Sequence, residues 1–262
     1  MNKESIMKAP AAQMRGHNLI AIASGKGGVG KTWLAISLVH AMARMGKRVL
    51  LFDGDFGLAN IDVQLGLIPE RDLENVFAGE IKSEQAILSF ADGGFDILPG
   101  RSGSGNLATL DGAKLNKLRN ELVSISENYN HTVVDLGAGL SKSVQTFSEN
   151  FKKTLVVLTD EPTSLVDAYA YIKLRAAKQH TPDIAIVVNQ AKTIQEGERT
   201  YATLRRACEN FLPFSPPLAG IIRHDPHVRE AIRAQTPLLI RHPNSDAAKD
   251  VETLAKKLAN GQ

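Results

Sequence analysis

Two patterns of apolar and polar positions alternate along the chain from residue 19 onward. Short, continuously apolar runs rich in β-branched residues predict buried strands, and the longer segments between them have the spacing of helices. The predicted strands are residues 19–23, 48–52, 131–136, 153–159, 183–189 and 218–222. Apolar strands separated by helices indicate a mostly parallel, twisted sheet with helices on both faces. No linker-like stretch divides the pattern, so we expect one α/β domain over residues 18–262 with about seven or eight strands.

Residues 69–112 interrupt this alternation. PERDLENVFAGE (69–80) and IKSEQAILSF (81–90) predict two short helices, FDILPG (95–100) predicts the end of a strand, and RSGSGN (101–106) predicts a loop. Residues 1–17 have no periodic pattern, which predicts a mobile N-terminal segment.

Composition excludes few classes of protein. Lys and Arg total 31 against 28 Asp and Glu, so the net charge neither requires nor excludes an acidic partner. The single cysteine, Cys208, cannot form an internal disulfide or supply a cysteine metal cluster, and its helical surroundings predict a buried or half-buried side chain. No apolar run approaches the roughly 18–20 residues of a membrane span, and the N-terminal residues lack the apolar region of a signal peptide. We expect a cytoplasmic protein.

Residues 25–32, GKGGVGKT, match the phosphate-loop pattern G-x-x-x-x-G-K-[ST] between a predicted strand and a predicted helix. Glycines allow backbone N–H groups to surround phosphate oxygens, and the helix N-terminus adds its positive dipole end. Lys31 would reach the β- and γ-phosphates, and Thr32 would offer a hydroxyl to Mg²⁺. We therefore expect a P-loop NTPase fold that binds the phosphates of a nucleotide together with Mg²⁺. The predicted nucleotide contacts are Gly25, Lys26, Gly27, Gly28, Val29, Gly30, Lys31, Thr32 and Trp33.

Acidic residues follow two further predicted strands. Asp53 and Asp55 end the run LLFDGD, and Asp135 ends VVD before a turn of small residues. The carboxyl ends of parallel strands share one edge of the sheet, so these acids should lie near the phosphate loop. Asp135 could hold Mg²⁺ through water. For Asp53, capping of a loop or helix is an equally good interpretation.

In this order and spacing, GKGGVGKT, DGDFGLAN and VVDLGAG resemble the deviant phosphate loop and switch segments of the MinD/ParA family of ATPases. The resemblance implies an ATP-dependent homodimer in which Lys26, the signature lysine, crosses to the partner's nucleotide. It implies that Asp55 positions the attacking water, with Asp53 in support, so that Lys26, Lys31 and Asp55 are the predicted catalytic residues. Thr32, Asp55 and Asp135 are the predicted metal site. The resemblance also pairs Asn189 with adenine, although a plain turn at the strand end is the alternative.

Three stretches resemble one branch of that family, the MinD-like ATPases that regulate flagellar number and placement. They are FDGDFGLANIDVQLGL (52–67), TDEPTSLVDAYAYIK (159–173) and HDPHVREAIRAQTPLL (224–239). This branch implies slow hydrolysis stimulated by a regulatory protein partner. The alternatives are a division-site MinD-type regulator and a ParA-type partition ATPase that binds non-specific DNA. Iron–sulfur members of the wider family need several cysteines, and this chain has one.

The sequence leaves several candidate binding partners undecided. The flagellar branch often carries an N-terminal segment that engages a signal-recognition-type GTPase, and residues 11–15 (AAQMR) keep only a fragment of it. The terminal stretch SDAAKDVETLAKKLANGQ places Val251, Leu254, Ala255 and Leu258 on one helical face. That face would either pack on the core or bind the cytoplasmic face of the inner membrane. DNA is a weaker expectation, because solvated helix faces also explain the C-terminal arginines. These are Arg199, Arg205, Arg206, Arg223, Arg229, Arg233 and Arg241.

Overall fold

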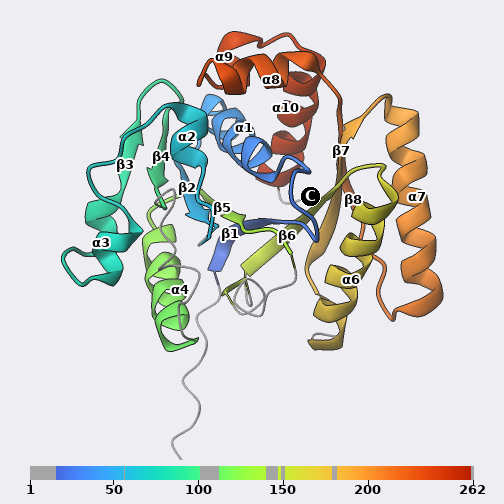
Figure 1. Ribbon diagram of the computed structural model, residues 1–262, viewed down its shortest axis with the longest axis horizontal. Coiled ribbons are helices and arrows are strands. Elements are labelled where there is room, and N and C mark those ends of the chain that lie inside the picture. The colour runs from blue at the N-terminus through green and yellow to red at the C-terminus, as the bar shows by residue number, and fades with distance from the viewer. Residues whose placement is uncertain are drawn as a thin grey trace, which may run out of the picture.

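A twisted sheet forms the centre of the computed structural model, which describes residues 16–55, 57–100, 112–139, 147–148, 151–178 and 182–260 (Figure 1). Within these residues the sheet has eight strands in the order β3-β4-β2-β5-β1-β6-β7-β8. Every neighbouring pair is parallel except β3 and β4. The strands are β1 (Gly16–Ala23), β2 (Val49–Gly54), β3 (Leu88–Phe90), β4 (Phe95–Leu98), β5 (His131–Leu136), β6 (Phe151–Leu158), β7 (Ile184–Ala191) and β8 (Leu218–Arg223).

Helices cover both faces of the sheet, as the sequence predicts (Figure 1). They are α1 (Lys31–Arg44), α2 (Ile61–Leu65), α3 (Leu73–Phe77), α4 (Gly112–Ser126), α6 (Pro162–Lys178), α7 (Ile194–Phe211), α8 (Pro226–Arg233), α9 (Leu238–Arg241) and α10 (Asp246–Ala259), with a 3₁₀ helix η1 (Ser83–Ala86). Alternation along β1 sends Ile20 and Ile22 into the core beneath α1 and α10, and Leu19 and Ala21 into the core beneath α4, α6 and α7. The expected α/β architecture is confirmed.

All six strands expected from the apolar runs are present, and FDILPG contains β4. The helix expected over residues 81–90 is wrong, because only Ser83–Ala86 form a 3₁₀ turn and Leu88–Phe90 form a strand. Gly94 adopts a left-handed φ of 67° and closes a hairpin in which Phe90 pairs with Phe95. Their rings lie 5.3 Å apart, so packing of the two aromatics favours the hairpin over a helix.

The last helix packs on the core. Val251, Leu254, Ala255 and Leu258 are all buried, in the same cluster as the apolar residues of α1. Of the two interpretations of this stripe, core packing is the one that the structure shows. None of the helices described is long and apolar enough to cross a bilayer.

Other expectations are met or lie outside the described residues. Cys208 is fully buried in α7, as its surroundings predicted. The strand β1 begins at Gly16, two residues before the predicted start of the domain. Three expectations lie outside the described residues. They are the mobile segment, of which only residues 16 and 17 are described, the fragment at residues 11–15 and the loop at residues 101–106.

Candidate functional site

The predicted site residues gather at the carboxyl edge of the sheet, around the end of its central strand β1. The loops that follow β1, β2, β5 and β7 meet there, which is where open parallel sheets bind ligands. The phosphate loop leaves β1 and enters α1 at Lys31.

The phosphate loop depends on glycines whose backbone conformation leaves N–H groups available to a ligand. Gly28 and Gly30 have φ of 80° and 91°, in the left-handed region where a side chain would be strained. Gly30 is the N-cap of α1 and offers no side-chain cap, and the first turn of α1 has no acidic residue. The N–H groups at the start of α1 are therefore available to an anion. A Cβ at Gly25 would overlap the backbone of Asp167, so α6 also requires a glycine there.

Lys31, Thr32 and Asp135 form the centre of the site. The Thr32 hydroxyl donates to Oδ2 of Asp135 at 2.6 Å. Lys31 is 8% exposed, and burial lowers the pKa of its ammonium group, although the carboxylates of Asp135 and Asp55 oppose that effect. Burial raises the pKa of Asp135 to about 7, against the opposing hydrogen bond from Thr32 and the charge of Lys31. The arrangement places positive and negative groups together beside the loop.

The donor set fits Mg²⁺. The second carboxylate oxygen of Asp135, Oδ1, is buried and has no hydrogen-bond partner among the described residues. Asp55 lies beside Gly137, whose added Cβ would meet Oδ1 of Asp55 at 3.0 Å. A hydroxyl and two carboxylates are the hard oxygen donors that Mg²⁺ prefers, directly or through water. The structure therefore brings Thr32, Asp55 and Asp135 together, as the resemblance implies.

Asp53 has a structural role in this edge. Its Oδ2 accepts the N–H groups of Asn60 and Ile61, both at 3.2 Å, and Oδ1 accepts the N–H of Asp55 at 3.2 Å. Asp53 is 2% exposed, and burial together with the charge of Asp135 raises the pKa of its carboxyl well above the ordinary value. The capping interpretation thus holds, and Asp53 supports Asp55 by fixing the backbone between β2 and α2.

Lys26 does not point into this centre. Its ammonium group pairs with the carboxylate of Glu161 and donates to the Thr163 hydroxyl at 3.0 Å. Both partners lie at the start of α6 in the same chain. Both residues lie in the stretch TDEPTSLVDAYAYIK (159–173), and the sequence alone did not predict a role for either of them.

A cleft of about 410 Å³ lies next to the loop, and Trp33 and Asn189 line it together with Gly28 and Gly30. The Asn189 side chain donates from Nδ2 to the Val29 carbonyl at 2.7 Å. Gln190 follows it with a left-handed φ of 59°, where the pairing of β7 with β8 shifts register, so the backbone is irregular directly after Asn189. Asn189 lines this cleft, and an amide there could offer its carbonyl and its second N–H to a purine edge.

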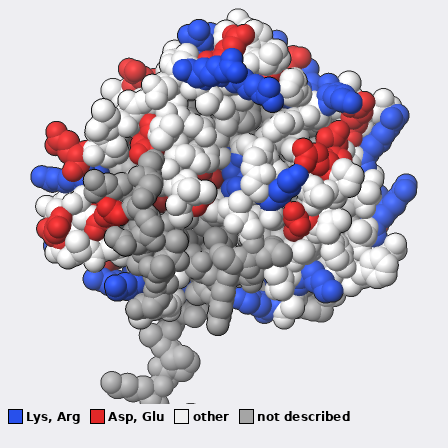
Figure 2. Space-filling model, in the orientation of Figure 1, with Lys and Arg blue, Asp and Glu red and all other residues white. Residues whose placement is uncertain are grey.

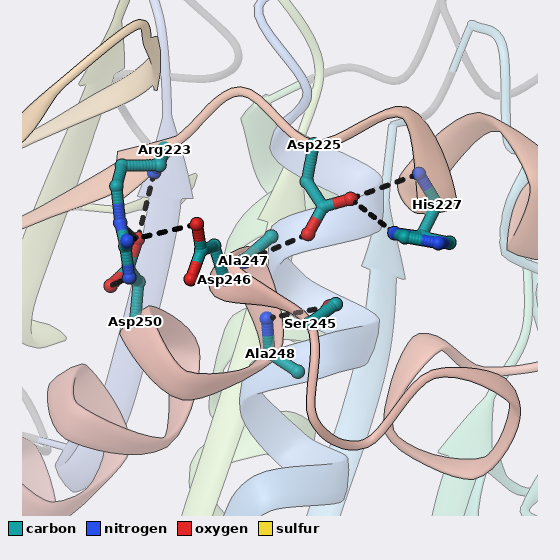
Figure 3. Close-up of polar contacts among 8 residues, drawn as sticks. All are labelled: Arg223, Asp225, His227, Ser245, Asp246, Ala247, Ala248 and Asp250. Carbon is teal, nitrogen blue, oxygen red and sulfur yellow. Dashed lines mark hydrogen bonds and ion pairs between the residues drawn. The ribbon is translucent and has the colours of Figure 1, made fainter.

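The far wall of the cleft was not predicted. Arg223, His224, Asp225, Val228, Arg229 and Ile232 line it, at the end of β8 and along α8. Arg223 is held by Asp250 at 2.9 Å and Asp246 at 3.0 Å, and Asp225 caps α8 (Figure 3). The Asp-Pro pair before HVREAIR is a helix-start signal that could have placed this wall at a strand end.

Charges on the visible face are mixed. Figure 2 shows Lys and Arg side chains interspersed with Asp and Glu. Of the C-terminal arginines, Arg205 pairs with Glu209, and Arg223 pairs with Asp246 and Asp250. These pairs leave less positive charge for nucleic acid than the sequence count indicates.

The chain is similar in sequence and fold to known nucleotide-binding proteins. Residues 20–238 match the CobQ/CobB/MinD/ParA nucleotide binding domain. The chain is 37% identical to the antiactivator FleN of Pseudomonas aeruginosa over 92% of this chain and 85% of that protein. It is 28% identical to the flagellum site-determining protein YlxH of Helicobacter pylori over 92% and 81% of the two chains. Among solved structures, the septum site-determining protein MinD from Pyrococcus horikoshii, complexed with Mg-ADP, is similar with a TM-score of 0.77 and 26% identity, over 92% of this chain and 95% of that chain.

Proposed function

Because the chain belongs to the CobQ/CobB/MinD/ParA nucleotide-binding family and is similar to its FleN type, we propose that it is a MinD-like ATPase whose nucleotide state controls dimerisation. The resemblance drawn from the three sequence motifs is confirmed at the level of the family. The proposed substrate is ATP with Mg²⁺, and the proposed process is the regulation of flagellar number or placement.

The contact that carries the catalytic proposal is the hydrogen bond between Thr32 and Asp135 beside Lys31. The α1 N-terminus and Lys31 would bind the β- and γ-phosphates, while Thr32 and Asp135 would hold hydrated Mg²⁺. Bound Mg²⁺ neutralises charge on the phosphate oxygens. Asp55 would orient the attacking water from the loop that Asp53 fixes in place. Asn189 and Trp33 would hold the base in the adjoining cleft.

The dimerisation proposal depends on Lys26. Nothing in its own phosphate loop occupies its ammonium group, which instead pairs with Glu161 and Thr163 at the surface. The exposed fractions of the Lys26 and Glu161 side chains are 37% and 59%, and such a solvated pair opens at low cost. Lys26 could therefore leave Glu161 and reach a nucleotide held by a second subunit, as an arginine finger does.

The flagellar assignment is supported by YlxH, a relative whose name states a role in determining the flagellum site, and by the three sequence stretches that resemble the flagellar branch of the family. A regulatory protein partner that stimulates hydrolysis belongs to the same proposal. A division-site role is the second candidate, since the fold is also that of MinD. DNA binding is less favoured because Arg205 and Arg223 already have acidic partners. Membrane association would have to use a surface other than the buried stripe of α10.

Light scattering after size-exclusion chromatography tests the switch. We expect a doubled mass for Asp55→Ala with ATP and Mg²⁺, and a monomer mass with ADP. Lys26→Ala in the same background should stay monomeric while still binding nucleotide, which separates dimerisation from binding. A monomer mass for Asp55→Ala saturated with ATP would refute the switch and leave only a nucleotide-binding domain.

A further inference from the structure

Two histidines and one glutamate converge on the surface of α8 and α9. His227 and Glu230 lie three residues apart on α8, so they share one face of that helix. His242 follows the end of α9. Each of the three side chains offers one ligand atom, and these atoms all lie within 4.8 Å of one another. None of the three residues belongs to the nucleotide site described above.

The side chains of this cluster lie in close contact. The imidazole rings of His227 and His242 have centroids 4.3 Å apart. Nε2 of His242 is shielded from solvent and lies 3.2 Å from the Glu230 carboxylate, yet it makes no hydrogen bond of ordinary geometry within the described residues. A nitrogen and a carboxylate oxygen at this distance could both bind one cation.

Asp225 supplies the outer support that metal-binding histidines generally have. Its Oδ1 lies 2.8 Å from Nδ1 of His227 and also accepts the His227 backbone N–H at 3.0 Å (Figure 3). Its Oδ2 accepts the N–H of Ala247 at the start of α10, at 3.2 Å. A carboxylate on Nδ1 fixes the tautomer and leaves Nε2 of the same ring as the metal ligand.

We propose that His227, Glu230 and His242 bind a Zn²⁺ ion that joins α8 to the segment after α9. Two imidazoles and one carboxylate are a zinc donor set that leaves the fourth position to water. Zinc bonds of about 2.1 Å separate tetrahedral ligands by about 3.4 Å. The His242–Glu230 pair is already at 3.2 Å, and the ligand atoms that lie farthest apart, within 4.8 Å, need to approach by at most about 1.4 Å. Glu230 and His227 are partly exposed and can make that adjustment by side-chain rotation.

Zinc here would act on the wall of the nucleotide cleft without entering it. Asp225, which orients His227, lines the cleft, as do Val228 and Arg229 on α8. A metal that ties α8 to His242 would restrict movement of this wall. The proposal does not depend on ATP hydrolysis or dimerisation. Mg²⁺ prefers oxygen donors, so the magnesium that accompanies a nucleotide should not displace zinc from two imidazoles.

Isothermal titration of the full chain, without a histidine tag and without nucleotide, tests the proposal with Zn²⁺ alone. We expect one ion per chain in the presence of millimolar Mg²⁺. His242→Ala and Glu230→Gln should each weaken binding at least tenfold. His131→Ala is the matched control, because it removes a partly exposed histidine at the amino end of β5 and should leave the affinity unchanged.

Two further measurements test whether zinc binds at this cluster. Thermal unfolding should show a rise in Tm with Zn²⁺ for wild type and His131→Ala but not for Glu230→Gln, whose exposed side chain carries little risk of misfolding. Co²⁺ in place of Zn²⁺ should give the visible absorption of a four-coordinate ion. Binding of wild-type strength in the His227→Ala, His242→Ala double variant would overturn the proposal, as would the absence of a one-to-one Zn²⁺ isotherm for wild type.

Discussion

The ammonium group of Lys26 and the carboxylate of Glu161 form an ion pair within one chain, between the phosphate loop and the start of α6. The Thr163 hydroxyl completes the set of partners at 3.0 Å. A lysine that acts across a dimer interface has to exchange these partners for the nucleotide of the other subunit. In the proposed dimer, the intrachain pair would therefore compete with the contact across the interface, and its strength would set part of the ATP requirement.

Removing the competitor should favour the dimer. We expect Glu161→Gln to lower the ATP concentration for half-maximal dimerisation by up to about fivefold, because an exposed ion pair contributes roughly 0–1 kcal/mol. Asp160→Asn removes the same charge from the adjacent, exposed position and should have little effect. Light scattering across an ATP titration measures both. A higher ATP requirement in Glu161→Gln would mean that Glu161 assists dimerisation and does not compete with it.

Magnesium affinity should depend on pH through Asp135. The pKa of this buried carboxyl is raised to about 7 without metal, so below pH 7 a proton has to leave before Mg²⁺ can bind. Mg²⁺ enhancement of ADP binding should weaken by up to about tenfold per pH unit below 7 and level off above it. Asp135→Asn should show weak enhancement at every pH. Titrations of ADP with EDTA provide the metal-free baseline, and an equally strong magnesium effect at pH 6 and pH 8 would contradict the assignment.

Stability should fall in acid because of His40. This α1 side chain is 4% exposed, and burial, with a smaller effect of Arg44, lowers its pKa to about 4. The unfolded chain binds a proton near pH 6.5 and the folded chain does not, so this contribution to stability is present above pH 6.5 and is lost as the pH falls toward 4. From pH 7.5 to 5, wild type should lose roughly 1–2 kcal/mol more than His40→Leu. Urea unfolding at both pH values measures the difference, and parallel losses would show that His40 is protonated in the folded state.

Trp33 should report on the cleft. It is the single tryptophan, is 6% exposed and lines the cleft beside Asn189. A base that enters the cleft would change the surroundings of the indole, so ADP and ATP should change the fluorescence of wild type in a saturable way. Trp33→Phe serves as the signal-free control and should bind a labelled nucleotide within a fewfold of wild type. Unchanged fluorescence at saturating nucleotide would place the base elsewhere.

Substitutions in α10 should affect folding. Leu254 is 1% exposed and packs in the cluster that α1 shares. Leu254→Ala should lower the free energy of unfolding by about 2–5 kcal/mol. Lys256→Ala, on the exposed side of the same helix, should cost less than about 0.5 kcal/mol. Equal, small effects in urea unfolding would show that the stripe of α10 does not contribute to the core.

The sequence correctly predicted those parts of the fold and site in which the local pattern of residues alone determines the structure. Continuously apolar strands, the glycine loop and the acids at strand ends lie where they were expected. The strand Leu88–Phe90 was missed because its pairing with β4 depends on the Gly94 turn and on contact between Phe90 and Phe95. Glu161 and Arg229 were missed for a related reason, since their places at the site come from packing between elements distant in sequence.

The burial of α1 bears on how this protein folds during synthesis. Residues Trp33–Met42 are buried without interruption, between the sheet on one side and α10 on the other. The helix that carries Lys31 and Thr32 thus cannot cover its outer face until residues 246–259 have left the ribosome. We expect a nascent chain to expose that apolar surface while the residues between α1 and α10 are being synthesised, which would favour binding by chaperones that recognise growing polypeptides. The nucleotide site, encoded near the start of the chain, would be among the last parts of the molecule to become rigid.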